Sequence, residues 1–131
     1  MNIEAYSVDY RSPDFNKKVE NFVRKKKFKK LPAQILDFIV EVEKGNFSGD
    51  IIEHSNEPPY DVYKARLPNE DVNVGKSNGY RLIYIAKHDN RIIAFLCIYY
   101  KKEDETVTDT YVKGLIDGYF LTTIKEEADT E

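Results

Sequence analysis

Residues 80–100, YRLIYIAKHDNRIIAFLCIYY, decide the fold of this chain. Two runs rich in β-branched and aromatic residues, 80–87 and 91–100, flank the short polar sequence His88-Asp89-Asn90. Such runs favour strands, and a short polar connection between them predicts an antiparallel hairpin. The second run is apolar at successive positions. We therefore expect it to lie inside the sheet, with both faces covered.

Two helices are predicted upstream of this hairpin. Ser12, followed by a proline and an aspartate, is typical of a helix start, and apolar residues then recur at helical spacing to about residue 27. A second helix is expected over residues 32–44, where Gly45 provides a stop. The connection between the two helices is short, so we expect them to form an antiparallel helical hairpin.

The remaining elements complete an α+β plan. Strands are expected at residues 3–8 and 60–67, a loop at 46–59, and a final helix at 106–124. An N-terminal helical hairpin would then pack on a small antiparallel sheet with a C-terminal helix. The length of 131 residues predicts one domain over residues 1–125, followed by an acidic, frayed tail at 126–131.

Composition excludes several classes of protein. One cysteine, Cys97, cannot form an internal disulfide, and the chain has too few cysteines and histidines for a structural zinc site. No apolar stretch reaches the ~20 residues of a membrane helix, and the N-terminal sequence does not resemble a signal peptide. We therefore expect a cytoplasmic protein that needs no metal or small-molecule cofactor and does not bind membranes.

Basic residues are concentrated in the middle of the chain. The chain carries a net charge of −3, yet residues 60–101 hold seven basic and four acidic side chains, while residues 102–131 hold three basic and nine acidic ones. A basic region is the usual footprint of a polyanionic partner.

Several of these basic residues are predicted to meet at one end of the sheet. Lys64 and Arg66 share a strand face because alternate residues point the same way. Arg81 opens the next strand after the glycine-containing turn GKSNG. The converging set comprises Lys64, Arg66, Lys76, Arg81, Tyr99 and Lys101. The same spacing also fits a solvated face of a half-exposed sheet, and it does not decide between the two.

Three stretches in this order, VYKARLP, GKSNGYRLIYI and IYYKKEDE, resemble the RelE/ParE superfamily of toxins from bacterial toxin–antitoxin pairs, closest to the HigB-like branch. The resemblance covers roughly residues 3–120. It implies a cognate antitoxin as protein partner. For the messenger-cleaving members it also implies a substrate, mRNA in the ribosomal A site, and a metal-independent attack of the 2′-hydroxyl on the adjacent phosphate.

The resemblance also implies roles for individual residues. Lys64 would act as general base, because arginine is effectively never deprotonated. Arg66 would hold phosphate, Arg81 would stabilise transition-state charge, and Lys101 or Lys102 would act as acid or phosphate clamp. Lys76 and Tyr99 would contact RNA. Tyr111 would stack on a base, although it fits the apolar stripe of its helix equally well.

Two features depart from the family pattern. Ribosome-directed members are usually strongly basic, whereas this chain is acidic overall, and the run Glu103-Asp104-Glu105 directly follows the candidate site. No histidine occupies a motif position, and His54 is expected in a surface loop. Two alternatives to an endoribonuclease therefore remain: a ParE-like inhibitor of DNA gyrase, and a non-catalytic binding module that keeps the toxin fold.

Overall fold

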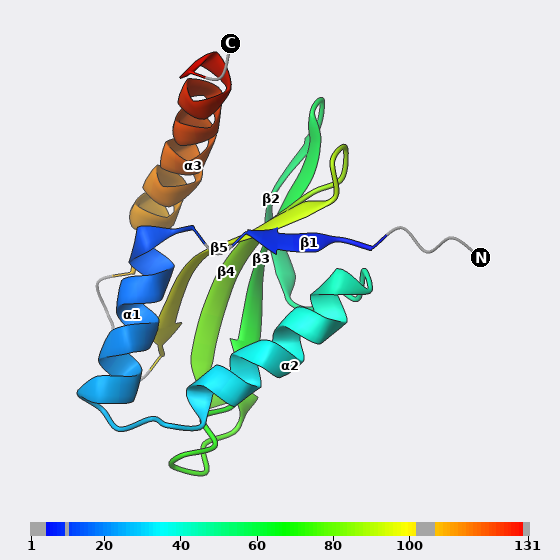
Figure 1. The fold of residues 1–131 in the computed structure, drawn as a ribbon. Coiled ribbons are helices and arrows are strands. Elements are labelled where there is room, and N and C mark those ends of the chain that lie inside the picture. Colours follow the sequence, from blue (N-terminus) through cyan, green and yellow to red (C-terminus); the bar gives the residue numbers. More distant parts are fainter. Residues whose placement is uncertain (1–4, 10, 102–106, 130–131) are drawn as a thin grey trace.

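The computed structural model describes residues 5–9, 11–101 and 107–129. Within them, three helices accompany a five-stranded sheet, which confirms the α+β class (Figure 1). The elements in chain order are β1 (Ser7–Asp9), α1 (Pro13–Arg24), α2 (Leu31–Glu43), β2 (Asp50–Asn56), β3 (Pro59–Leu67), the 3-10 turn η1 (Lys76–Asn78), β4 (Tyr80–Lys87), β5 (Ile92–Tyr100) and α3 (Asp109–Asp129).

The sheet is mixed, so the expectation of a purely antiparallel sheet is wrong. Its strand order is β1-β5-β4-β3-β2, in which β2 to β5 pair antiparallel with their neighbours. β1 instead runs parallel to β5, with Ser7 opposite Ile92. β1 leads almost directly into α1, which packs on β5, and this docking sets the direction of the strand. As predicted, β5 lies inside the sheet and is buried along nearly all its length.

Helices α1 and α2 cover one face of the sheet. In Figure 1 they meet at the loop between them and spread apart from it across the strands. Gly45 ends α2 as predicted, with φ at +87°, a conformation that suits glycine. Ser12 precedes α1, but its hydroxyl donates a hydrogen bond to the Leu96 carbonyl at 3.3 Å rather than capping the helix. This contact ties the start of α1 to β5.

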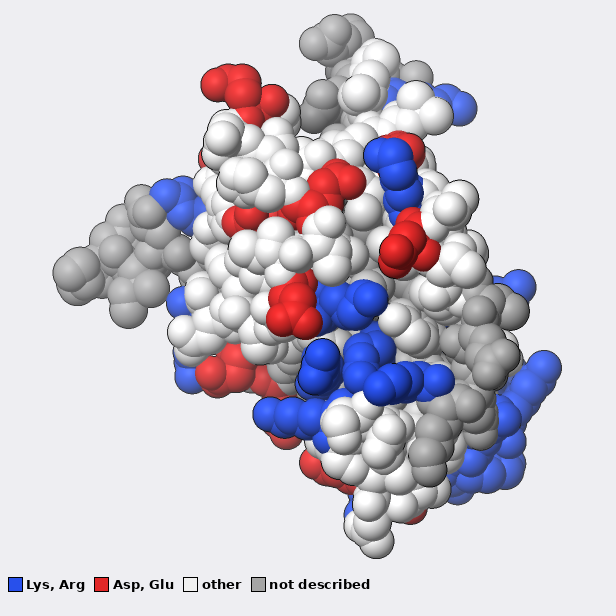
Figure 2. All heavy atoms as spheres, turned by 180° about the vertical axis from the view of Figure 1, so that it is seen from behind, with Lys and Arg blue, Asp and Glu red and all other residues white. Residues whose placement is uncertain are grey.

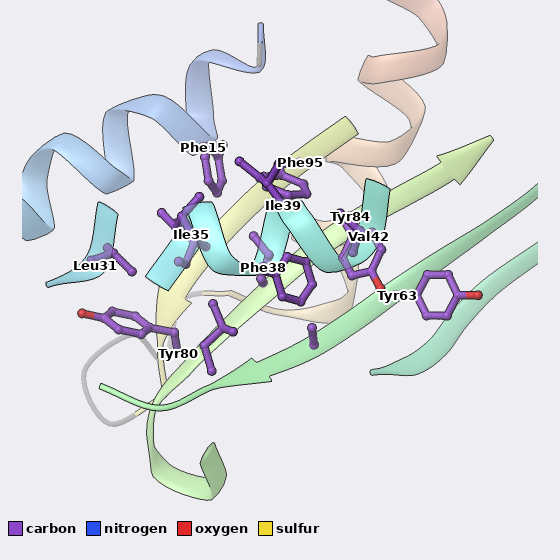
Figure 3. Packing of buried hydrophobic residues seen from close by; sticks show 14 of the residues in the cluster. Phe15, Leu31, Ile35, Phe38, Ile39, Val42, Tyr63, Tyr80, Tyr84 and Phe95 are labelled. Carbon is purple, nitrogen blue, oxygen red and sulfur yellow. The ribbon is translucent and has the colours of Figure 1, made fainter. Parts of the chain in front are cut away.

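The core under these two helices is rich in aromatic side chains (Figure 3). Phe95 of β5, 1% exposed, has ring-centroid distances of 5.3 Å to Phe15 and 5.8 Å to Phe38. Phe38 also meets Tyr84 edge-on at 5.3 Å. Such pairs add to the free energy gained by burying their area.

Helix α3 covers part of the opposite face. Its Val112 and Ile116 are buried against a second apolar cluster that includes Ile83 and Leu96. The helix runs to Asp129 and so includes residues 126–129 of the predicted acidic tail, whose fraying stays a prediction. None of the helices in the described part of the chain combines the length and apolarity that a membrane crossing requires.

The structure corrects the predicted loop at 46–59, because β2 lies within it. β2 is an edge strand, and its pairing with β3 shifts register between Ile51 and Glu53, which marks a β-bulge. The loop-forming glycine and prolines lie at its two ends. Gly49, with φ at +110°, lies so close to β3 that an added Cβ would be 2.5 Å from the Lys64 carbonyl oxygen.

Candidate nucleic-acid interface

Strand register brings most of the predicted site residues together. Arg66 of β3 lies opposite Arg81 of β4, which lies opposite Tyr99 of β5. Lys64 lies two residues before Arg66, so all four side chains belong to the α3 side of the sheet, at the end of the strands. The predicted convergence of Lys64, Arg66, Arg81 and Tyr99 therefore agrees with the register.

This end of the face carries accessible basic side chains. Figure 2 shows Lys and Arg side chains gathered near the middle of the molecule seen from behind, with acidic groups at their edge. Lys64 is half-buried, and the Arg66 side chain is 56% exposed. Asp50 of β2 lies opposite Lys64 and approaches Arg66 at 3.8 Å between Oδ2 and Nη2. An exposed pair of this length is weak, so Arg66 can exchange it for another anion.

Arg81 is buried, which does not fit the direct contact with phosphate that the resemblance implies for it. It is 5% exposed, and its guanidinium donates to the carbonyls of Lys76 at 2.9 Å and Ser77 at 2.8 Å. Burial lowers the pKa of Arg81 from its ordinary value, and the nearby charge of Arg66 adds to this effect. A guanidinium still remains charged, so the carbonyl oxygens of the turn compensate a buried cation.

The side chains of Arg81 and Lys101 therefore both bind backbone carbonyls of the turn at 75–79. Lys101 Nζ also donates to the Ser77 carbonyl, at 3.2 Å, and its backbone N–H donates to the Gly79 carbonyl. Lys76 is exposed at the start of η1. Lys76 and Lys101 thus lie beside Arg81, as predicted, although Arg81 and Lys101 contact the turn itself.

The two glycines of this turn have different surroundings. Neither Gly75 nor Gly79 has a positive φ. Gly79 is buried, and a Cβ there would collide with the carbonyl oxygen of Leu67. Gly79 therefore lets the turn lie directly on the end of β3, whereas Gly75 faces open space.

Three further residues were predicted to contact RNA, and the structure describes two of them. Tyr99 is 9% exposed and belongs to the apolar cluster under α3, so little of its ring faces solvent. Tyr111 is 37% exposed, but its hydroxyl donates to Asp14 Oδ1 at 2.7 Å, on the first turn of α1. The structure does not bring Tyr111 to the cationic end of the sheet. Lys102 lies outside the described residues.

Sequence reasoning missed a second polar group, which links β2 and β3 to Tyr6 and His88 outside the strands. Asp61 of β3 lies 2.7 Å from His54 Nδ1 through one carboxylate oxygen and 2.8 Å from His88 Nε2 through the other. His88 Nδ1 in turn lies 2.8 Å from the Tyr6 hydroxyl. His54 belongs to β2, so the expectation of a loop histidine is wrong. Asp61 is an odd-numbered β3 residue, and it therefore points to the face opposite Lys64 and Arg66.

The hydrogen bonds of this group favour the charged form of His54 and the ionised form of Asp61. An ionised carboxylate only accepts, so His54 Nδ1 donates to Asp61, and its Nε2 donates to Asn56 Oδ1 at 2.8 Å. These two bonds raise the pKa of His54 above its ordinary value. Partial burial raises the pKa of Asp61, but hydrogen bonds from His54 and His88 outweigh it and leave that pKa lowered.

The two polar regions have different chemical capacities. The end of β3 to β5 offers the exposed cation of Arg66 and the half-buried amine of Lys64. Both histidines of the chain contact Asp61 on the other face and are not available to that end. In residues 5–9, 11–101 and 107–129, no three histidine, cysteine or carboxylate side chains are grouped to hold a metal ion.

Comparison with known proteins does not assign a family. No protein-family model matches the chain, and a search of curated proteins found none that is significantly similar.

Proposed function

We propose that this protein is a toxin of the RelE/ParE type that cleaves messenger RNA on the ribosome without a metal ion. The observation that carries the proposal is the convergence of Lys64, Arg66, Lys76 and Lys101 beside an open end of the sheet. The sequence resemblance to HigB-like toxins supplies the reaction. Cations on a solvent-accessible strand face suit a phosphodiester backbone, which is bound mainly through its phosphates.

In the proposed reaction, Lys64 in its neutral form takes the proton of a ribose 2′-hydroxyl. The 2′-oxygen then attacks the adjacent phosphorus, and the bond to the 5′-oxygen breaks, which leaves a cyclic phosphate and a 5′-hydroxyl. Arg66 binds the non-bridging oxygens as negative charge accumulates on them. Lys101 donates a proton to the leaving oxygen and binds the turn in the free protein.

Arg81 has a different role in this proposal from the one that the sequence suggests. Its guanidinium is buried and directed at carbonyls of the turn, so it positions Lys76 rather than binding phosphate directly. The partners are a cognate antitoxin, which blocks the site, and the messenger in the ribosomal A site.

The test is messenger cleavage by the purified full-length chain on programmed ribosomes, with and without EDTA. Arg66→Ala is expected to lower the cleavage rate by roughly 10²–10³, the usual cost of removing one preorganised charge-stabilising group. Lys44→Ala is the matched control, because this exposed lysine at the C-terminal end of α2 forms an ion pair with Glu41 at 3.5 Å and lies away from the strand end. It is expected to cleave at the wild-type rate.

Two results would contradict the proposal. One is cleavage by Arg66→Ala at the wild-type rate, when circular dichroism shows that both variants are folded. The other comes from pulse labelling of expressing cells: loss of thymidine incorporation before methionine incorporation would favour inhibition of DNA gyrase.

A second candidate is a non-catalytic RNA-binding module with the same fold. It is favoured by the internal hydrogen bonds of Arg81, which leave fewer cations to stabilise a transition state. In this case Arg66→Ala would weaken RNA binding, and the wild-type chain would bind messenger without cutting it.

A further inference from the structure

A cavity of about 490 Å³ lies between α3 and the start of α1, above β5, away from the cationic end of the sheet. Its volume falls in the usual range of small-molecule sites, roughly 300–1,000 Å³. Apolar walls are provided by Leu96 of β5 and Leu115 of α3. Such a volume beside apolar walls can accept the body of a small organic ligand.

Two glycines of α3 contribute to this space. Gly114 and Gly118 line the cavity one helical turn apart, and a Cβ built on either meets no atom within 4 Å. Each glycine weakens the helix by roughly 1 kcal/mol relative to alanine. The bare helix face therefore keeps open a volume that side chains would otherwise enter.

The charged groups around the cavity are mainly acidic. Among the described residues that line it, Arg11 is the one basic residue, and its guanidinium is already bound to Asp9 at 2.9 Å and Glu126 at 3.2 Å. With Asp14 included, three carboxylates face one guanidinium, a formal charge of −2. An anionic ligand would be repelled here, whereas a cationic ligand would be attracted.

One oxygen of the Asp14 carboxylate lacks a hydrogen-bond donor among the described residues. Its Oδ1 accepts from the Tyr111 hydroxyl at 2.7 Å, but its Oδ2 is buried and has no hydrogen-bond partner among the described residues. A buried carboxylate oxygen without a donor is costly, and a charged N–H group is the partner that compensates it best. The Asp14 carboxylate thus places a negative charge with few donors at the edge of an apolar space, where it attracts an ammonium group.

We propose that this cavity binds a small organic ammonium ion, with its apolar body over Gly114 and Gly118 and its charged end at Asp14. The experiment is an NMR titration of the isotope-labelled full chain with benzylammonium. For a ligand of this size we expect a dissociation constant on the order of 1 mM, with the largest shifts at the amides of the two glycines.

Matched variants separate the charge from the cavity. Asp14→Asn is expected to weaken binding about tenfold, because it removes a charge-assisted hydrogen bond, while Asp117→Asn, an exposed carboxylate elsewhere on α3, leaves it unchanged. Gly118→Leu fills the space without weakening the helix and is expected to abolish binding. Benzyl alcohol, a neutral analogue, is expected to bind at least about tenfold more weakly than benzylammonium.

Three results would overturn the proposal: no shift at either glycine, equal binding of benzyl alcohol, or unchanged binding by a folded Asp14→Asn variant. A parallel titration with Nα-acetyl-lysine amide identifies the source of the ammonium group. Tighter binding of this compound than of benzylammonium assigns the group to a polypeptide side chain, and the reverse order assigns it to a free amine.

Discussion

The two faces of the sheet differ in how completely they are covered. Helices α1 and α2 cover one face with an aromatic core centred on Phe38, Tyr84 and Phe95. On the other face, α3 covers one part, and the end of β3 and β4 exposes Arg66 and half-exposes Lys64. The first face therefore supplies most of the stability. The second keeps polar groups in contact with solvent, where they can bind a partner.

The largest expected effect comes from the covered face. Phe95→Ala should lower the free energy of unfolding by about 3–5 kcal/mol, because it empties the centre of the aromatic core. Ile116→Ala, under α3, should cost about 2 kcal/mol, because α3 covers less of the sheet. Urea denaturation measures both, with Leu121→Ala, 70% exposed, as a surface control. A greater loss for Ile116→Ala than for Phe95→Ala would contradict the comparison.

The next effect concerns the turn beside the cationic end. Gly79→Ala should lower the free energy of unfolding by about 3 kcal/mol, because the new Cβ collides with the Leu67 carbonyl, a backbone atom that cannot turn aside. Gly75→Ala meets no atom and should change stability by less than about 1 kcal/mol. Thermal unfolding of the two variants tests this pair, and equal melting temperatures would show that the turn does not depend on the close approach.

A smaller loss is expected from Arg81→Ala, about 1–2 kcal/mol, because the carbonyls of Lys76 and Ser77 lose a charged donor. Arg66→Ala, on the same face but 56% exposed, should cost less than about 1 kcal/mol. Chemical denaturation compares the two, and hydrogen exchange at residues 76–79 should accelerate only in Arg81→Ala. If the exchange rates at the turn do not change, Arg81 does not position it.

The smallest expected effect is the pH dependence of stability that arises from His54 and Asp61, on the side of the sheet that α1 and α2 cover. The hydrogen bonds that raise the pKa of His54 stabilise the fold. Their contribution is complete below the ordinary pKa of 6.5 and is lost as pH rises through the raised pKa. The hydrogen bonds that lower the pKa of Asp61 stabilise the fold above the ordinary pKa of 3.8. This contribution is lost as pH falls through the lowered pKa. The pair therefore contributes most between these two values.

The measurement is urea denaturation of the wild type and Asp61→Asn across this range and above it. The wild type should lose stability relative to Asp61→Asn as pH rises past the raised pKa of His54. Parallel pH profiles for the two proteins would show that the Asp61 group does not contribute.

Local patterns made much of the fold predictable. β4 begins and ends where the sequence indicates, because the strand and its hairpin turn are both encoded by neighbouring residues. β2 was missed because it is a strand only through its pairing with β3. β1 was expected to be antiparallel, but its direction depends on where α1 docks, which no nearby residue reveals.

The candidate site shows the same limit. The shared face of Lys64 and Arg66 follows from strand alternation, and the register of β3 on β4 brings Arg81 beside them. The burial of Arg81 depends on how the turn folds over it, and the contact of Tyr111 with Asp14 depends on how α3 packs. The Asp61 group joins residues from distant parts of the chain, and only the assembled sheet brings them together.

The irregularity in β2 has a consequence for self-association. An edge strand offers unpaired backbone groups, and Ile51 and Ile52, 55% and 40% exposed, would make this edge adhesive to a second extended chain. The shift in register between Ile51 and Glu53 interrupts the straight ladder that such pairing needs. The bulge thus disfavours fibre growth. Deleting Ile52 would straighten β2 and favour amyloid-like assembly.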